Sequence, residues 1–159
     1  MILRIIYTFL VGIFLAIFIG VGISAFYESP KYPEMPSTLK YCTAEVKDVK
    51  QYVEFKNQAE AFDKLEKSFM VQEKIYNRNV AIIAIIAASA LVIVSLTLLR
   101  KILLIADGIL LGGVFTLIYS VIRGFGAEDT KFQFLVVSVG LIITLTLGYV
   151  KFIKPAKER

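Results

Sequence analysis

The chain has 159 residues, of which 57% are hydrophobic, and a formal net charge of +5 at pH 7. It has no histidine and one cysteine, Cys42, which excludes histidine-based metal sites, Ser-His and Cys-His nucleophile pairs, zinc clusters and any internal disulfide. There is also no phosphate-binding glycine loop and no Gly-x-Ser-x-Gly motif, so we expect no enzyme activity, no metal and no cofactor.

Four long apolar runs hold most of the hydrophobic residues. A bilayer core about 30 Å thick takes roughly 20 helical residues, and each backbone polar group in it must be paired within its own segment. We therefore predict an all-α integral membrane protein, a four-helix transmembrane bundle. The first run could instead be a signal peptide, but it is longer than the roughly 7–15 apolar residues of one, so a retained helix is preferred. The predicted spans are residues 5–27, 80–99, 102–122 and 132–150.

Lysine and arginine residues near the span ends predict the orientation. With four crossings, Arg4, the Arg100-Lys101 link and the four basic residues of the tail lie on one side, so the positive-inside rule places both termini in the cytoplasm of a multi-pass cell-membrane protein. Residues 28–79 and the loop 123–131 then lie outside, and each has a net charge of 0. Since no basic surface is left to meet phosphates, we expect membrane lipids and no nucleic acid as partners. The basic residues are Arg4, Arg100 and Lys101, with Lys151, Lys154, Lys157 and Arg159 in the tail 151–159.

Small residues recur every four positions in three of the spans, which places them on one face of each helix. In lipid, such residues let helix backbones approach closely and increase van der Waals contact. We expect this ladder to pack within the bundle, and a homodimer seam on the first span is the alternative. The ladder residues are Gly12, Ala16, Gly20 and Ser24 in the first span, Gly108 and Gly112 in the third, and Gly140 and Gly148 in the fourth.

The segment between the first two spans changes character along its length. Residues 28–42 contain three prolines spaced by three, the repeat of a polyproline II helix, which predicts a stiff spacer. Residues 43–79 lack glycine and proline, and apolar side chains recur there every three or four positions. This pattern predicts a long amphipathic helix outside the membrane, with Thr43 as a candidate N-cap. The helix could be straight, broken near Asn57 or at 77–79, or continuous with the second span.

The apolar stripe of this predicted helix must be buried against another surface. It can fold back on its own chain, pair in a coiled coil, dock on a partner or lie on lipid, and its electrically neutral polar face argues against lipid. We expect pairing in a homo-oligomer or docking in a larger membrane complex. The stripe residues are Val49, Tyr52, Ala59, Phe62, Leu65, Phe69 and Tyr76.

Asp107 is the only charged side chain well inside a predicted span. Burying a charge in lipid is costly, so such a residue is a candidate for proton or cation transfer. The structural alternative, which we favour, is an ion pair with Lys151 or Arg4, because Asp107 lies only about 9 Å along the helix from the turn at Lys101. The leading function is thus a structural or accessory subunit whose outer helix binds a partner or a second copy. A small oligomeric transporter or channel that uses Asp107 is the alternative.

Overall fold

The computed structural model describes residues 2–40, 49–97 and 102–153. These residues form helices and connections without a strand. Thr43, Cys42, the Arg100-Lys101 link and the tail from Lys154 onward lie outside the described residues. The elements are α1 (Ile2–Phe26), α2 (Ser37–Lys40), α3 (Val49–Thr97), α4 (Leu103–Phe125), α5 (Thr130–Gly148) and a single π-helical turn, η1 (Tyr149–Ile153).

Four of these helices, namely α1, α3, α4 and α5, are long and apolar enough to cross a membrane. The prediction of an all-helical chain with four such helices is confirmed for the described residues. Their large apolar side chains are widely exposed on the surface of the chain, such as Phe18 (73%) on α1 and Ile142 (63%) on α5. This exposure suits a lipid environment, because lipid tails are themselves apolar and contact with them carries no hydrophobic penalty.

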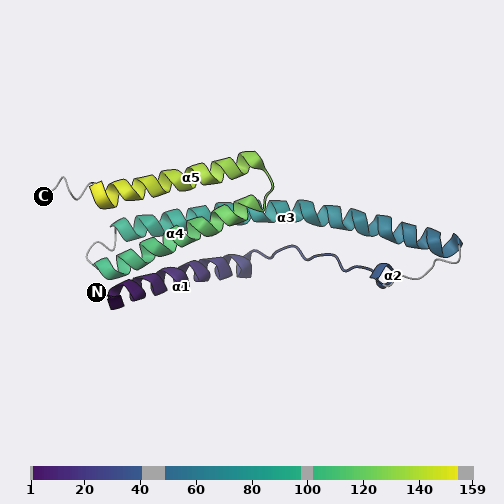
Figure 1. The fold of residues 1–159 in the computed structure, drawn as a ribbon, viewed down its shortest axis with the longest axis horizontal. Helices are drawn as coiled ribbons and strands as arrows, with labels where there is room; N and C mark the ends of the chain where they lie inside the picture. The colour runs from purple at the N-terminus through teal and green to yellow at the C-terminus, as the bar shows by residue number, and fades with distance from the viewer. Residues whose placement is uncertain (1, 41–48, 98–101, 154–159) are drawn as a thin grey trace.

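α4 is the central helix of the arrangement (Figure 1). It contacts α3, α1 and α5, whereas α1 and α5 make no contact with each other. In Figure 1 these two helices lie on opposite sides of the α3–α4 pair, so the arrangement is open and does not close around one core. α1 meets α3 at a small cluster of buried side chains, formed by Ile23, Tyr76, Val80 and Ala84.

The two ends of the molecule differ. One end, here called the hairpin end, holds the start of α1, the start of α4 and the turn η1 (Figure 1). The opposite end, here called the stalk end, holds the α4–α5 loop. From this end α3 projects far beyond the other helices (Figure 1). Residues 49–76 of α3, up to the contacts of Lys74 with the α4–α5 loop and of Tyr76 with Tyr27, are here called the stalk.

α3 is one unbroken helix of 49 residues, about 70 Å long at about 1.5 Å per residue. The predicted outer helix is therefore continuous with the second span, one of the possibilities that the sequence left open. No glycine or proline occurs from Ser37 to Asp107, so no residue there removes a backbone donor or has the conformational freedom of glycine.

The segment after α1 continues in the direction of α1 and runs beside the stalk to α2 (Figure 1). The Tyr32 hydroxyl donates a hydrogen bond to Glu66 Oε1 at 2.9 Å. The Tyr32 ring also meets the Phe69 ring edge-on, with centroids 5.1 Å apart. The sequence predicted a spacer here, and the structure adds that this spacer covers part of the stalk and contains the short helix α2.

The α4–α5 loop is fastened to the base of the stalk. Lys74 Nζ lies 2.7 Å from Glu128 Oε2, and Asn77 Nδ2 donates to the carbonyl oxygen of Gly126 at 3.3 Å. Glu128 adopts a left-handed backbone conformation with φ of 51°. Asp129 then caps α5, because its side chain accepts hydrogen bonds from the first backbone N–H groups of that helix.

Candidate functional site

The predicted ladder of small residues packs inside the chain where α1 crosses α4. A Cβ added at Gly108 would lie 2.8 Å from Val11 Cγ1, and one at Gly112 would lie 2.8 Å from Leu15 Cδ2. On the other helix, a Cβ at Gly12 would lie 3.0 Å from Leu111 Cγ. Each glycine thus accepts a side chain of the opposite helix, which allows close backbone approach in lipid.

The same ladder opens toward the stalk end. A Cβ added at Gly20 would meet only Tyr119 Cζ, at 4.0 Å, and Ser24 is exposed. Here α1 and α4 form an open apolar groove with a volume of about 470 Å³, here called the α1–α4 groove. It is lined by Ala16, Ile17, Gly20, Val21 and Ser24 of α1 and by Tyr119 and Arg123 of α4.

Two ladder residues of α5 do not pack within the chain. Among the described residues, nothing lies within 4 Å of a Cβ placed at Gly140 or Gly148, so neither glycine receives a side chain of another described helix. α5 is buried at Val136 and Leu147 instead. Val136 packs on Gly124 of α4, where an added Cβ would lie 3.3 Å from Val136 Cγ1.

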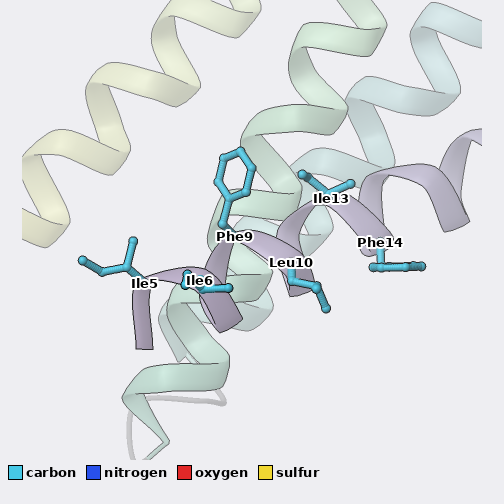
Figure 2. A pocket seen from close by; sticks show the side chains of 6 residues that line it. All are labelled: Ile5, Ile6, Phe9, Leu10, Ile13 and Phe14. Atoms are coloured by element: carbon cyan, nitrogen blue, oxygen red, sulfur yellow. The ribbon is translucent and has the colours of Figure 1, made fainter. Parts of the chain in front are cut away.

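α1 carries another apolar cavity toward the hairpin end, of about 410 Å³ (Figure 2). All of its lining residues belong to α1, and none is polar. Phe9 is the only one with a described ring contact, edge-on to Phe115 with centroids 5.6 Å apart. A surface of this kind can accept lipid tails but offers no group for chemistry. Its lining residues are Ile5, Ile6, Phe9, Leu10, Ile13 and Phe14.

Asp107 is paired with Lys151 at the hairpin end. Lys151 Nζ lies 2.5 Å from Asp107 Oδ1, and both side chains are partly exposed. Lys151 belongs to η1, so the π-helical turn at the end of α5 carries the cation that meets the α4 carboxylate. Arg4, the other partner considered, forms no ion pair within the described residues.

Hydroxyl groups in the apolar helices bond to backbone carbonyl groups. The Ser95 hydroxyl donates to Ala106 O at 2.6 Å and the Ser120 hydroxyl to Ala81 O at 2.8 Å, so both join α3 to α4. Thr144 Oγ1 donates to Gly140 O, one turn earlier in its own helix. These hydroxyl groups are engaged by backbone carbonyl groups within and between the helices, so they do not line a polar path.

The residues of the predicted stripe fall into two groups. Phe62 and Tyr76 are buried, and Phe69 is half-buried beside Tyr32. Tyr52 and Leu65 are 57% and 55% exposed. Ala59 is half-buried, and Val49 begins α3. The chain's own segment therefore covers part of the stripe and leaves part of it open.

Arg123 forms a polar centre at the stalk end that the sequence did not reveal. Its Nη1 donates to Asn77 Oδ1 at 3.0 Å and its Nε donates to the Tyr119 hydroxyl at 3.1 Å. The guanidinium also lies over the rings of Tyr76 and Tyr119, 5.7 and 5.5 Å from their centroids. Tyr27 stacks on Tyr76 with centroids 5.2 Å apart, which holds that ring in place.

A polar cavity of about 300 Å³, here called the stalk-end cup, opens beside this guanidinium. No carboxylate of the described residues lies within 4.0 Å of Arg123. Glu73 lines the same cup, and it too has no ion-pair partner in this part of the chain. The cup is lined by Ser24, Ser29, Pro30, Glu73, Tyr76, Asn77 and Arg123.

The described residues hold no group of three or more side chains that could bind a metal ion. No protein-family model, no curated protein and no solved structure matches the chain. Its function is therefore argued from the geometry of its own residues.

Proposed function

We propose that the chain is a multi-pass membrane protein that acts as a structural or accessory subunit, with the stalk as its binding element for a partner protein or a second copy. The observation that supports this function best is the continuity of α3 from the apolar helices into the stalk. The stalk extends about 40 Å at about 1.5 Å per residue.

A continuous helix fixes the distance and the direction of a bound partner relative to the apolar helices. The contacts of Tyr32 with Glu66 and Phe69 brace the stalk along one side. Beyond them, Tyr52, Val53 and Leu65 remain more than half exposed. Apolar side chains left exposed on a helix in water favour a protein contact that covers them.

The orientation in this proposal follows from charge. The basic residues Arg4, Arg100, Lys101 and those of the tail 151–159 favour a cytoplasmic hairpin end and cytoplasmic termini in a cell membrane. The stalk then projects on the outer side. A partner would be met outside the cell membrane, at a fixed height above it.

A transporter or channel has less support. Asp107, the residue that would carry a proton or cation, is engaged by Lys151. Thr144 and Thr146 donate their hydroxyl protons to carbonyl groups of their own helix. Neither group is arranged to replace the hydration shell of an ion.

Site-directed photocrosslinking in native membranes tests the stalk as a binding element. A photoreactive residue at Tyr52 or Leu65 should give an adduct of discrete mass, and one at the buried Phe62 should give none. Tyr52→Asp combined with Leu65→Asp should convert the larger species on a native gel to the monomer, whereas Glu60→Ala, a polar exposed change, should not.

A chain that runs as a monomer and gives no adduct from either exposed position would contradict the accessory function. Ion flux through vesicles, abolished by Asp107→Asn, would instead support the transporter.

A further inference from the structure

We propose that the stalk-end cup and the α1–α4 groove together bind one phospholipid, with its phosphate at Arg123 and one acyl chain in the groove. The two cavities share two lining residues, Ser24 and Arg123. One is polar and lies at the end of the apolar helices, and the other is apolar and runs along them. The inference rests on the membrane setting proposed above but not on a partner for the stalk.

The groove has the dimensions of one acyl chain in one leaflet. Its α1 lining runs from Ser24 to Ala16, which is about 12 Å at about 1.5 Å per residue. One leaflet of hydrocarbon is about 15 Å thick, half of the bilayer core. Gly20 keeps the groove open at its middle, because the nearest atom to a Cβ there is Tyr119 Cζ at 4.0 Å.

Arg123 is suited to the phosphate. Its guanidinium has more N–H donors than its contacts with Asn77 and Tyr119 use, and guanidinium and phosphate form short, charge-assisted hydrogen bonds. Those contacts and the rings of Tyr76 and Tyr119 hold the group in one orientation. A cation fixed in this way, with no carboxylate of the described residues in salt-bridge range, complements an anionic group.

Glu73 selects among phospholipids. Its carboxylate lines the same cup without an ion pair in the described residues, so a headgroup with a net negative charge is repelled by it. A headgroup that carries an ammonium beside its phosphate meets both charges, the phosphate at Arg123 and the ammonium at Glu73. The favoured ligand class is therefore the phosphatidylethanolamine type.

Lipid binding to the purified full-length protein in detergent can be counted by native mass spectrometry. Phosphatidylethanolamine should bind at least about tenfold more tightly than diacylglycerol, which lacks the phosphate, and than glycerophosphoethanolamine, which lacks the chains. It should also bind more tightly than phosphatidylglycerol. Equal retention of diacylglycerol would overturn the phosphate site, and equal binding of the chain-free headgroup would overturn the groove.

Two pairs of variants locate the site. Arg123→Gln should weaken phosphatidylethanolamine binding about tenfold, whereas Arg78→Gln, which removes an exposed cation that lines neither cavity, should not. Gly20→Leu fills the groove and should weaken binding without touching Arg123. Gly22→Leu adds the same side chain where nothing lies within 4 Å, and should leave binding unchanged.

Thermal stability in detergent shows whether each variant is folded. If Arg123→Gln fails to fold, the glycine pair still decides: equal binding by Gly20→Leu and Gly22→Leu overturns the proposal. Glu73→Gln should remove the preference over phosphatidylglycerol, and a preference that persists would overturn the role of Glu73. Stalk crosslinking does not depend on either cavity, so failure of one proposal is distinguishable from failure of the other.

Discussion

Tyr32 holds the segment after α1 against the stalk through a hydrogen bond and a ring contact to α3. Its hydrogen bond to Glu66 raises the pKa of Tyr32 above its ordinary value of 10.0. Loss of hydration and the negative charge of Glu66 raise it further. The contact exists only while the phenol keeps its proton, so it is sensitive to alkaline pH.

The sign of this dependence follows from the raised pKa. The contact contributes fully below pH 10.0 and is lost as the pH rises through the higher pKa of the folded state. In an alkaline titration followed by tyrosinate absorbance, the difference between the wild type and Tyr32→Phe gives the titration curve of Tyr32. Its midpoint should therefore lie above pH 10. Glu66→Gln should bring the midpoint back toward the ordinary value, because it removes the charge. An unchanged midpoint in Glu66→Gln would show that Glu66 is not the cause.

Single residues also show how far sequence reasoning reaches. Asp107 could be recognised, and Lys151 named as a partner, because charge is rare inside apolar helices and both residues lie near the same end. Arg123 could not be recognised as a centre. Its partner Asn77 is far away in sequence and belongs to another helix, so only the tertiary arrangement brings the two together.

At the scale of elements, the crossing of α1 and α4 is held by side chains seated on glycines. A leucine at Gly112 would overlap Leu15, whose Cδ2 would lie 2.8 Å from the new Cβ. Gly112→Leu should therefore destabilise the folded protein by about 1–3 kcal/mol, the usual effect of overpacking, seen as a lower thermal midpoint in detergent.

Gly140→Leu is the matched control for this prediction, since nothing lies within 4 Å of a Cβ at that position. It should leave the midpoint unchanged. A larger loss from Gly140→Leu than from Gly112→Leu would show that the ladder of α5, and not that of α4, makes the important contact.

The sequence predicted the helices but not their pairing. The apolar runs and their lengths are sufficient to predict four helices, because helices satisfy backbone polar groups without a partner. The four-residue spacing of small residues is the same in α1, α4 and α5, so it does not indicate which face meets which helix. The structure pairs α1 with α4, and it places no described side chain on Gly140 or Gly148.

The sequence also did not predict that α3 is continuous. Asn77 and Asn79 have low helix propensity and can compete for the backbone, which made a break at this point plausible. In the structure both side chains bond elsewhere, Asn77 to Gly126 and Arg123, and Asn79 to the Tyr27 hydroxyl. These tertiary contacts leave the backbone ladder of α3 intact.

At the scale of the whole molecule, the stalk is joined to the apolar helices at one place. The Lys74–Glu128 ion pair and the contacts of Asn77 tie the base of the stalk to the α4–α5 loop. The stacked rings of Tyr27 and Tyr76 tie it to the end of α1. A movement of the stalk would therefore be transmitted to α1, α4 and α5 through the contacts at the stalk end.

The arrangement of the two ends makes a prediction about the membrane. The starts of α1 and α4 and the turn η1 share the hairpin end, whereas the stalk and the α4–α5 loop lie at the opposite end (Figure 1). In a Cys42→Ser background, single cysteines at Glu54 and Thr130 should react with a membrane-impermeant maleimide on intact cells. A cysteine at Ile102 should react only after lysis, because the positive-inside rule keeps the hairpin end in the cytoplasm. Labelling of the Ile102 and Thr130 positions from the same face would mean that α4 does not cross the membrane, and the four-span arrangement would then be wrong.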